Sequence, residues 1–184
     1  VQFHSLLVSQ YVSVQKADLF RLDMATGALT PIGDHRKVAA QGGAEFAPDG
    51  TIWMTSDEGS DFQRLGILDP ATGKFTPKGP AEKWDVDNFD IADDGSFIAY
   101  VVNEAGMSKL RLLDPGSGTV RTVDLPAFGG LSDVAFDDHR RFAALQGVAS
   151  AHERLATSRI EAGGVWKRAA TCGLEDASLA PVRL

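Results

Sequence analysis

The sequence has a single cysteine, few cationic residues and no long apolar run. Cys172 cannot form an intramolecular disulfide, and one cysteine excludes zinc sites made of several. The 18 Lys and Arg residues against 25 Asp and Glu give a net charge of -7, which opposes the counterion release that dominates nucleic-acid affinity. No run of about eighteen apolar residues is present to cross a bilayer. The sequence therefore predicts neither nucleic acid nor a membrane as a partner.

The features of a targeting segment are also lacking at the N-terminus. The sequence has no initiator Met, and no basic segment precedes its first apolar residues, so no signal peptide is predicted. We interpret residues 1–8 as starting inside a strand. A cytoplasmic location is the expectation, and the periplasm is the alternative that the sequence leaves open.

The composition that remains is that of a chain that folds around a core. Of the 184 residues, 43% are hydrophobic, and glycine and proline number 19 and 8. These proportions exclude a disordered or collagen-like chain, and the length suits one domain of ordinary size.

A short turn motif recurs along the chain at a nearly constant period. Asp-Met-Ala-Thr-Gly occupies residues 23–27, Asp-Pro-Ala-Thr-Gly residues 69–73 and Asp-Pro-Gly-Ser-Gly residues 114–118, so the final glycines are 46 and 45 residues apart. A degraded copy follows at residues 160–164. Asp caps a turning backbone and Gly supplies the positive φ of tight hairpin turns, so each copy is expected to close a hairpin.

A second turn motif keeps the same period in its own phase. Pro-Asp-Gly lies at residues 48–50, Asp-Asp-Gly at residues 93–95 and Asp-Asp-His at residues 137–139, at spacings of 45 and 44. Two markers with one period indicate an internal structural repeat.

The segments between the turns predict strands. They are short, apolar and rich in β-branched and aromatic residues, and no stretch of ten or more residues has clean helical periodicity. A unit of about 45 residues with four short strands is typical of a β-propeller blade. We therefore predict an all-β fold with about three complete blades of four antiparallel strands plus three strands of another. This would be an open or partial propeller, and a closed four-bladed ring is the alternative.

The predicted blades have definite bounds. They cover residues 1–33, 34–79, 80–125 and 126–170 of a partial propeller at 1–170, followed by a tail or linker at 171–184. The strands are expected near 3–9, 18–23, 28–32, 43–46, 51–56, 64–69, 74–78, 86–91, 96–102, 109–114, 119–124, 131–136, 141–146, 153–159 and 165–169. The first blade lacks an innermost strand. Open blade edges predict a tendency to self-associate.

One part of the third repeat carries a more specific pattern. An Asn-x-x-Gly-x-Ser-x-Leu run lies between two predicted strands, at Asn103, Gly106, Ser108 and Leu110. This run resembles the propeller of the prolyl oligopeptidase family of serine peptidases. Residues 123–136 resemble the family's passage between blades, through a Leu-Pro and a Gly, and residues 173–184 resemble the stretch that leads out of its last blade.

The resemblance implies a propeller that caps a peptidase active site and admits only short peptides, which is a gating role. The family's nucleophilic Ser, in a G-x-S-x-G elbow, and its Asp and His lie in an α/β-hydrolase domain that follows the propeller. The implied partners are that domain of the parent chain and a peptide substrate. The resemblance implies no catalytic, cofactor-binding or metal-binding residue within this chain.

Two other functions stay open. The turn motifs also occur in TolB-like propellers, so a stand-alone module that binds a protein or a small ligand is one alternative, because a fold does not fix a function. A small four-bladed structural module is the other.

A search for catalytic or metal-binding patterns finds none that is specific. No G-x-S-x-G elbow occurs, and no helical two-His spacing is present among His4, His35, His139 and His152. We expect the third and fourth of these on a hairpin and in a solvated loop. A calcium loop is considered for the acidic residues but lacks its ordered ligand series, so turn chemistry is the preferred interpretation of Asp85, Asp87, Asp90, Asp93 and Asp94.

Aromatic residues recur beside the hairpin turns, and we predict that they pack between blades. These are Phe46, Trp53, Phe89, Tyr100, Phe136 and Phe142. Trp84 and Trp166 depart from that phase, and Trp84 is the better candidate for a rim position in contact with a ligand. Cys172 is expected to be structural or incidental.

Overall fold

The computed structural model describes residues 4–123, 130–136, 141–147, 153–160, 166–173 and 176–180. Every regular element in these residues is a β-strand. No helix capable of crossing a membrane is found among them. The chain divides into two compact units, Val1–Val86 and Asp87–Leu184. We describe each unit by itself.

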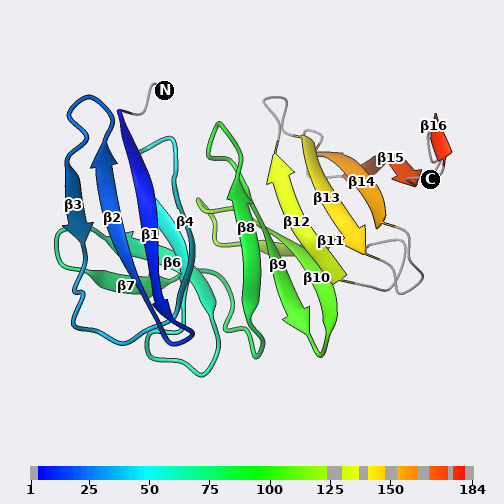
Figure 1. The fold of residues 1–184 in the computed structure, drawn as a ribbon. Coiled ribbons are helices and arrows are strands. Elements are labelled where there is room, and N and C mark those ends of the chain that lie inside the picture. Colours follow the sequence, from blue (N-terminus) through cyan, green and yellow to red (C-terminus); the bar gives the residue numbers. More distant parts are fainter. Residues whose placement is uncertain are drawn as a thin grey trace. The chain divides into compact units, whose positions relative to one another are not determined.

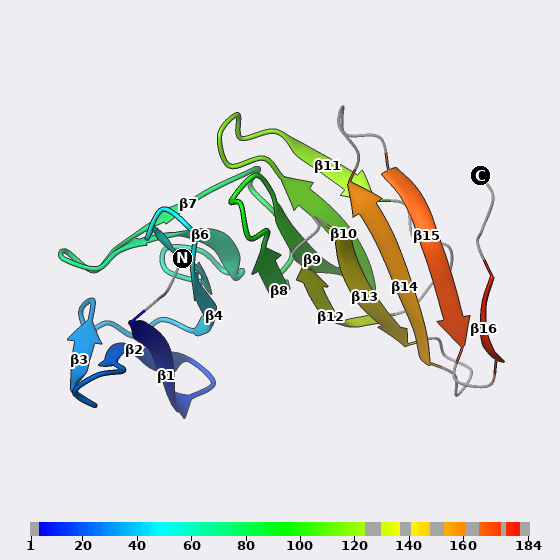
Figure 2. The ribbon, with the colours of Figure 1, turned by 90° about the horizontal axis from the view of Figure 1, so that it is seen from above.

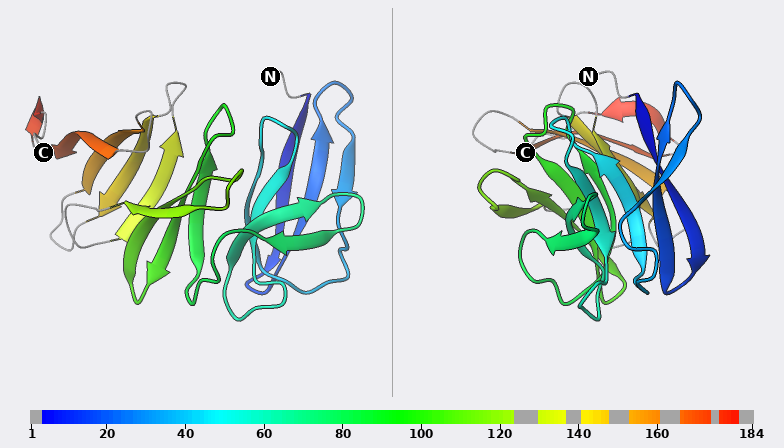
Figure 3. Two further views of the ribbon diagram at one scale, coloured as in Figure 1. Left: turned by 180° about the vertical axis from the view of Figure 1, so that it is seen from behind. Right: turned by 90° about the vertical axis from the view of Figure 1, so that its left-hand side faces the viewer.

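The first unit contains two antiparallel sheets (Figure 1). The first sheet has the strand order β1-β2-β3, and the second has the order β4-β5-β6-β7. Figure 3 shows β6 and β7 side by side, in agreement with their antiparallel pairing. The strands are β1 (Ser5–Ser13), β2 (Lys16–Asp23), β3 (Leu29–Ile32), β4 (Gln41–Phe46), β5 (Ile52–Ser56), β6 (Arg64–Asp69) and β7 (Lys74–Pro77).

The second unit also contains two antiparallel sheets. The third sheet has the order β11-β10-β9-β8, and the fourth has the order β12-β13-β14-β15-β16. Figure 2 shows β13, β14 and β15 running side by side. The strands are β8 (Val86–Ile91), β9 (Ile98–Glu104), β10 (Met107–Leu113), β11 (Val120–Val123), β12 (Gly130–Phe136), β13 (Arg141–Gly147), β14 (Glu153–Ile160), β15 (Trp166–Gly173) and β16 (Asp176–Ala180).

The core of the first unit contains side chains from both of its sheets. Leu19 and Ile32 lie in register on β2 and β3, and Ile52, Leu68 and Phe75 form one row across β5, β6 and β7. All five belong to one cluster and are at most 7% exposed. Burial of aliphatic and aromatic area of this kind is the main favourable term that stacks one sheet on another.

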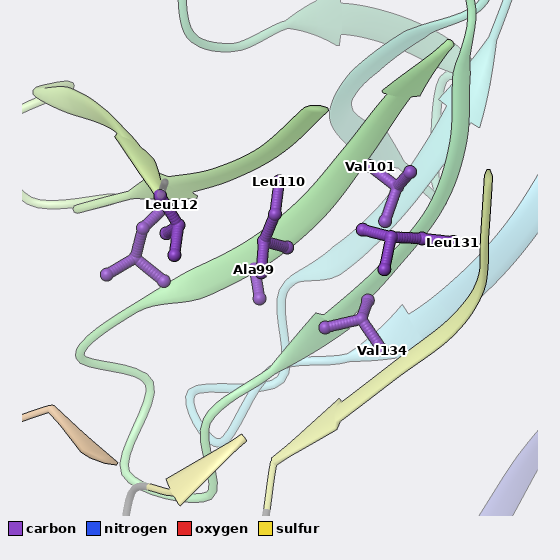
Figure 4. Packing of buried hydrophobic residues seen from close by; sticks show 7 residues of the cluster. Ala99, Val101, Leu110, Leu112, Leu131 and Val134 are labelled. Atoms are coloured by element: carbon purple, nitrogen blue, oxygen red, sulfur yellow. The ribbon is translucent and has the colours of Figure 1, made fainter. Parts of the chain in front are cut away.

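The second unit repeats this arrangement (Figure 4). Its core cluster draws on β9, β10, β11 and β12, and its buried members are Ala99, Val101, Leu110, Leu112, Val123, Leu131 and Val134. Leu110 is fully buried and pairs in register with Val101 on one side and Val123 on the other. The third and fourth sheets therefore pack through a face of alternating aliphatic residues.

The prediction of an all-β fold is confirmed, and the strands of the second and third repeats, β4 to β11, end within two residues of their predicted positions. Strand β1 continues to Ser13, beyond the predicted end, because its second half is mostly polar and gave no apolar run. The fourth sheet has a fifth strand, β16, which pairs with β15 inside the predicted tail. The predicted turns at 137–139 and 160–164 lie outside the described residues, and the domain bounds stay a prediction.

A tight turn of Ala105 and Gly106 joins β9 to β10. Glu104 and Met107 are paired across it, and the two turn residues have φ values of 53° and 81°. Positive φ at both central positions is the geometry of a type I′ hairpin turn, in which Asn-Gly is favoured. Ala105 is the only non-glycine with positive φ among the described residues.

We expect Ala105→Asn to raise the free energy of unfolding by about 1 kcal/mol, because asparagine tolerates the left-handed conformation better than alanine does. The measurement is urea unfolding followed by circular dichroism. Ala71→Asn is the matched control, since Ala71 lies in a turn of the same chain but has no positive φ. An unchanged or lower stability of the Ala105→Asn protein would contradict this account of the turn.

Candidate functional site

The repeated Asp-x-x-Thr-Gly turns are built by side-chain hydrogen bonds. Oδ1 of Asp23 accepts from the backbone N–H groups of Ala25 and Thr26, at 2.9 and 2.8 Å, and from the hydroxyl of Thr26 at 2.9 Å. The N–H of Gly27 donates to the carbonyl of Asp23 at 2.8 Å, and its φ of 71° closes the turn. The carboxylate thus satisfies the donors that the turning backbone leaves free.

The next two copies have the same construction. Oδ1 of Asp69 accepts from the N–H of Ala71 at 2.9 Å, and its Oδ2 accepts from the hydroxyl of Thr72 at 2.7 Å. Oδ1 of Asp114 accepts from the N–H of Ser117 at 3.1 Å. The prediction that these motifs close hairpins is confirmed, because they join β2 to β3, β6 to β7 and β10 to β11.

These hydrogen bonds lower the pKa values of the three aspartates. The backbone N–H of Thr26 is the main cause at Asp23, and the backbone N–H of Ser117 is the main cause at Asp114. The hydroxyl of Thr72 is the main cause at Asp69. A carboxylate held in its ionised form by turn donors is a poor general acid or base near neutral pH, so these aspartates are structural.

The lowered pKa values predict a specific loss of stability in acid. A carboxyl group with a lower pKa in the folded state stabilises the fold above its unfolded pKa, and this contribution is lost as pH falls through the folded pKa. We therefore expect the stability difference between the wild type and Thr72→Ala, which removes the main hydrogen bond to Asp69, to shrink below about pH 4. Urea unfolding at several pH values measures it. Thr76→Ala, at an exposed threonine on β7, is the control, and a difference independent of pH would contradict the prediction.

The second family of turns is equally local. In the first described copy, the N–H of Gly50 donates to the carbonyl of Ala47 at 2.8 Å, and Oδ1 of Asp49 accepts from the N–H of Thr51 at 2.9 Å. In the next copy, the N–H of Gly95 donates to the carbonyl of Ala92 at 2.7 Å. The two turns join β4 to β5 and β8 to β9.

The acidic run from Asp85 to Asp94 is dispersed over separate structural roles. Oδ1 of Asp85 accepts from the N–H of Gln63 at 2.8 Å, and Oδ1 of Asp94 accepts from the N–H of Ser96 at 3.0 Å. The carboxylate of Asp90 accepts from the N–H of Phe136. Among the described residues no three His, Cys, Asp or Glu side chains gather closely enough to hold a metal ion.

The two described histidines do not form a site together. His4 is exposed, and its carbonyl accepts from the N–H of Met24 at 2.8 Å. His35 packs edge-on against Phe20, with ring centroids 4.8 Å apart, and its Nε2 lies 3.1 Å from the carbonyl oxygen of Leu19. The predictions for His139 and His152 fall outside the described residues.

The Asn-x-x-Gly-x-Ser-x-Leu run connects the third sheet to the fourth. Oδ1 of Asn103 accepts from the N–H of Gly106 at 3.0 Å and so stabilises the β9–β10 turn. The hydroxyl of Ser108 accepts from the N–H of Leu131, near the start of β12, at 2.7 Å. Leu110 is buried in the core below. Each position of the run therefore has a structural task in joining two sheets.

The recurring aromatic residues are packed as predicted wherever their side chains are described. Trp53, Phe89 and Tyr100 are at most 4% exposed, and Phe46 and Phe136 pack against the two core clusters. Trp84 is 38% exposed, as expected of a residue outside that phase. The side chains of Phe142, Trp166 and Cys172 lie outside the described residues.

Sequence analysis missed one polar contact of the first unit. Nζ of Lys37, in the segment between β3 and β4, lies 2.7 Å from Oε1 of Glu58 and donates to the carbonyl of Gly73 at 3.2 Å. These partners are 21 and 36 residues away in the sequence, so no local pattern could indicate them. The contact ties the linker to the second sheet.

No protein-family model and no curated protein sequence matches the chain. Solved structures do share its fold. A prolyl endopeptidase, analysed for the role of inter-domain dynamics in catalysis and specificity, has a TM-score of 0.71 and 16% identity over 90% of this chain and 24% of its own length. Prolyl oligopeptidase B from Galerina marginata has a TM-score of 0.70 and 10% identity over 90% of this chain and 24% of its own.

TolB from Acinetobacter baumannii is similar to the same extent, with a TM-score of 0.68 and 14% identity over 90% of this chain and 40% of its own. At these identities the likeness shows the fold. The four sheets are therefore blades of a β-propeller, named blade 1 (β1–β3), blade 2 (β4–β7), blade 3 (β8–β11) and blade 4 (β12–β16). The chain spans about a quarter of the length of the two peptidases that it matches.

Proposed function

We propose that this chain is the non-catalytic propeller segment of a prolyl oligopeptidase-like serine peptidase, and that it gates the access of peptide substrates to a hydrolase domain. The observation that carries the proposal is the shared fold with two prolyl peptidases, joined with the Asn-x-x-Gly-x-Ser-x-Leu run of blade 3. Inter-domain dynamics are linked to catalysis and specificity in one of these proteins. A gating propeller acts in the same way as other lids and domain closures.

The described side chains support a scaffold role. The carboxylates of the repeated turns and Asp90 accept hydrogen bonds from the backbone, and Ser108 ties blade 3 to blade 4. A gate that excludes large substrates must resist local opening, and buried cores with satisfied turns provide that resistance. Under this proposal, substrate chemistry belongs to the hydrolase domain, and residues 171–184 lead toward it.

The test is the complete reading frame that encodes this chain. The proposal expects a G-x-S-x-G elbow with a downstream Asp and His after Leu184, and cleavage of a short chromogenic peptide by the full product. The 184-residue chain alone should release no chromophore. Peptidase activity in the isolated chain would overturn the assignment of chemistry to another domain.

A TolB-like binding module is the second candidate, favoured by the likeness to TolB at nearly the same TM-score. It would bind a protein or a small ligand at one rim of the propeller. A stop codon directly after Leu184 would favour this module, and it would exclude a hydrolase domain that follows the propeller in the same chain.

A further inference from the structure

Exposed apolar side chains gather on blade 1. Among the described residues nine large hydrophobic side chains are exposed, and six of these belong to blade 1 or its turns. They are Leu6, Tyr11, Val12, Val14, Met24 and Leu29. Single exposed hydrophobic residues need no explanation, but a concentration on one sheet marks an interaction surface.

The register of blade 1 arranges part of this surface in a row. Leu6 on β1 pairs with Leu22 on β2, and Leu22 pairs with Leu29 on β3. Side chains alternate between the two faces of a strand, so this row lies on the face opposite to Leu19 and Ile32. Leu19 and Ile32 are the residues that contribute to the core shared with blade 2.

Blade 2 contains the equivalent row, and there it is covered. Leu22 directly precedes the turn aspartate of its blade, as Leu68 does in blade 2, so the row Ile52, Leu68 and Phe75 corresponds to the row of blade 1. The blade 2 row belongs to the same cluster as Leu19 and Ile32 of blade 1 and is at most 7% exposed. In blade 1 the end members, Leu6 and Leu29, are 49% and 52% exposed.

Strand β1 shows a second sign of a missing neighbour. It lies at the edge of its sheet, whereas the corresponding strands β5 and β9 each pair with an inner strand, β4 and β8. Its nine residues include no charged residue and no proline, which are the usual means of protecting a natural sheet edge. An unprotected edge of this length is suited to pair with another strand.

We propose that the face formed by Leu6, Leu22 and Leu29 is the docking surface for another propeller blade. That blade is an antiparallel sheet that presents branched aliphatic side chains, as Leu19 and Ile32 do toward blade 2. The proposal continues an interface that the chain already makes, one repeat further along. It depends on the blade architecture and is independent of the peptidase assignment.

The test compares thiol labelling in the 184-residue chain and in the product of the complete reading frame. In a Cys172→Ser background, Leu29→Cys places one thiol on the proposed surface. Thr30→Cys is the matched control, because Thr30 is the next residue on β3 and is also exposed. We expect maleimide to modify the Leu29→Cys thiol at least about tenfold more slowly in the complete product, and the Thr30→Cys thiol at equal rates in both.

Equal labelling of the Leu29→Cys thiol in the two proteins would overturn the proposal. Protection that depends on the concentration of the 184-residue chain would also overturn it, because a second copy would then be the occupant. Hydrogen exchange of the β1 amides in the unsubstituted proteins gives the same comparison without a variant. These outcomes are separate from the peptidase assignment, which is tested by peptide cleavage.

Discussion

Replacing Leu110 by alanine is expected to lower the free energy of unfolding by about 2–5 kcal/mol. Leu110 is fully buried, and it lies in the cluster between blades 3 and 4 together with Val101 and Leu131. Its truncation removes transfer free energy and leaves a cavity that well-packed neighbours fill only in part. The loss is a large fraction of the stability of an ordinary domain.

Leu29→Ala is the matched control for this variant. The chemical change is the same, but Leu29 is 52% exposed on blade 1, so its truncation in the 184-residue chain should cost less than about 1 kcal/mol. Urea unfolding of both variants measures the difference. Equal losses would contradict the assignment of the core to the faces between blades.

Gly66→Ala is the second substitution with a large expected effect. A Cβ atom at Gly66 would lie 2.5 Å from the carbonyl oxygen of Thr76 and 2.7 Å from the ring of Phe75. The carbonyl belongs to the neighbouring strand and cannot rotate away, so β6 and β7 must separate. We expect a loss of about 1–3 kcal/mol in the free energy of unfolding.

Phe75→Leu tests the origin of that loss. The smaller side chain removes the ring contact, while the contact with the carbonyl of Thr76 remains. The double variant should therefore lose less than the sum of the single losses, a coupling that a double-mutant cycle detects in thermal or urea unfolding. Strict additivity would contradict the proposed clash between the Gly66 position and the aromatic ring.

The turns could be predicted from the sequence because their chemistry is local. Asp23 and Gly27 are four residues apart, and they make the hydrogen bonds of one turn with the residues between them. The same holds for Asp69 and Asp114, so the period of the motif gave the period of the blades. Strand β16 was missed because no Asp-Gly turn of this kind separates it from β15.

Contacts between blades had no such local signal. Asp90 and Phe136 are 46 residues apart, and Ser108 and Leu131 are 23 residues apart. Only the resemblance singled out Ser108, and it did not indicate the partner. The acidic run appeared as a group in the sequence, but Asp85 and Asp90 each serve a different backbone amide. Proximity along a strand therefore did not indicate a shared ligand site.

The central claim is that these blades gate access to a peptidase active site. The most direct measurement is kcat/KM of the complete product for a short peptide and for a long polypeptide with the same cleavage sequence, before and after Leu110→Ala loosens the blades. The account predicts a preference for the short peptide of about tenfold or more that shrinks in the variant. An equal preference in both proteins, or none in either, would contradict it.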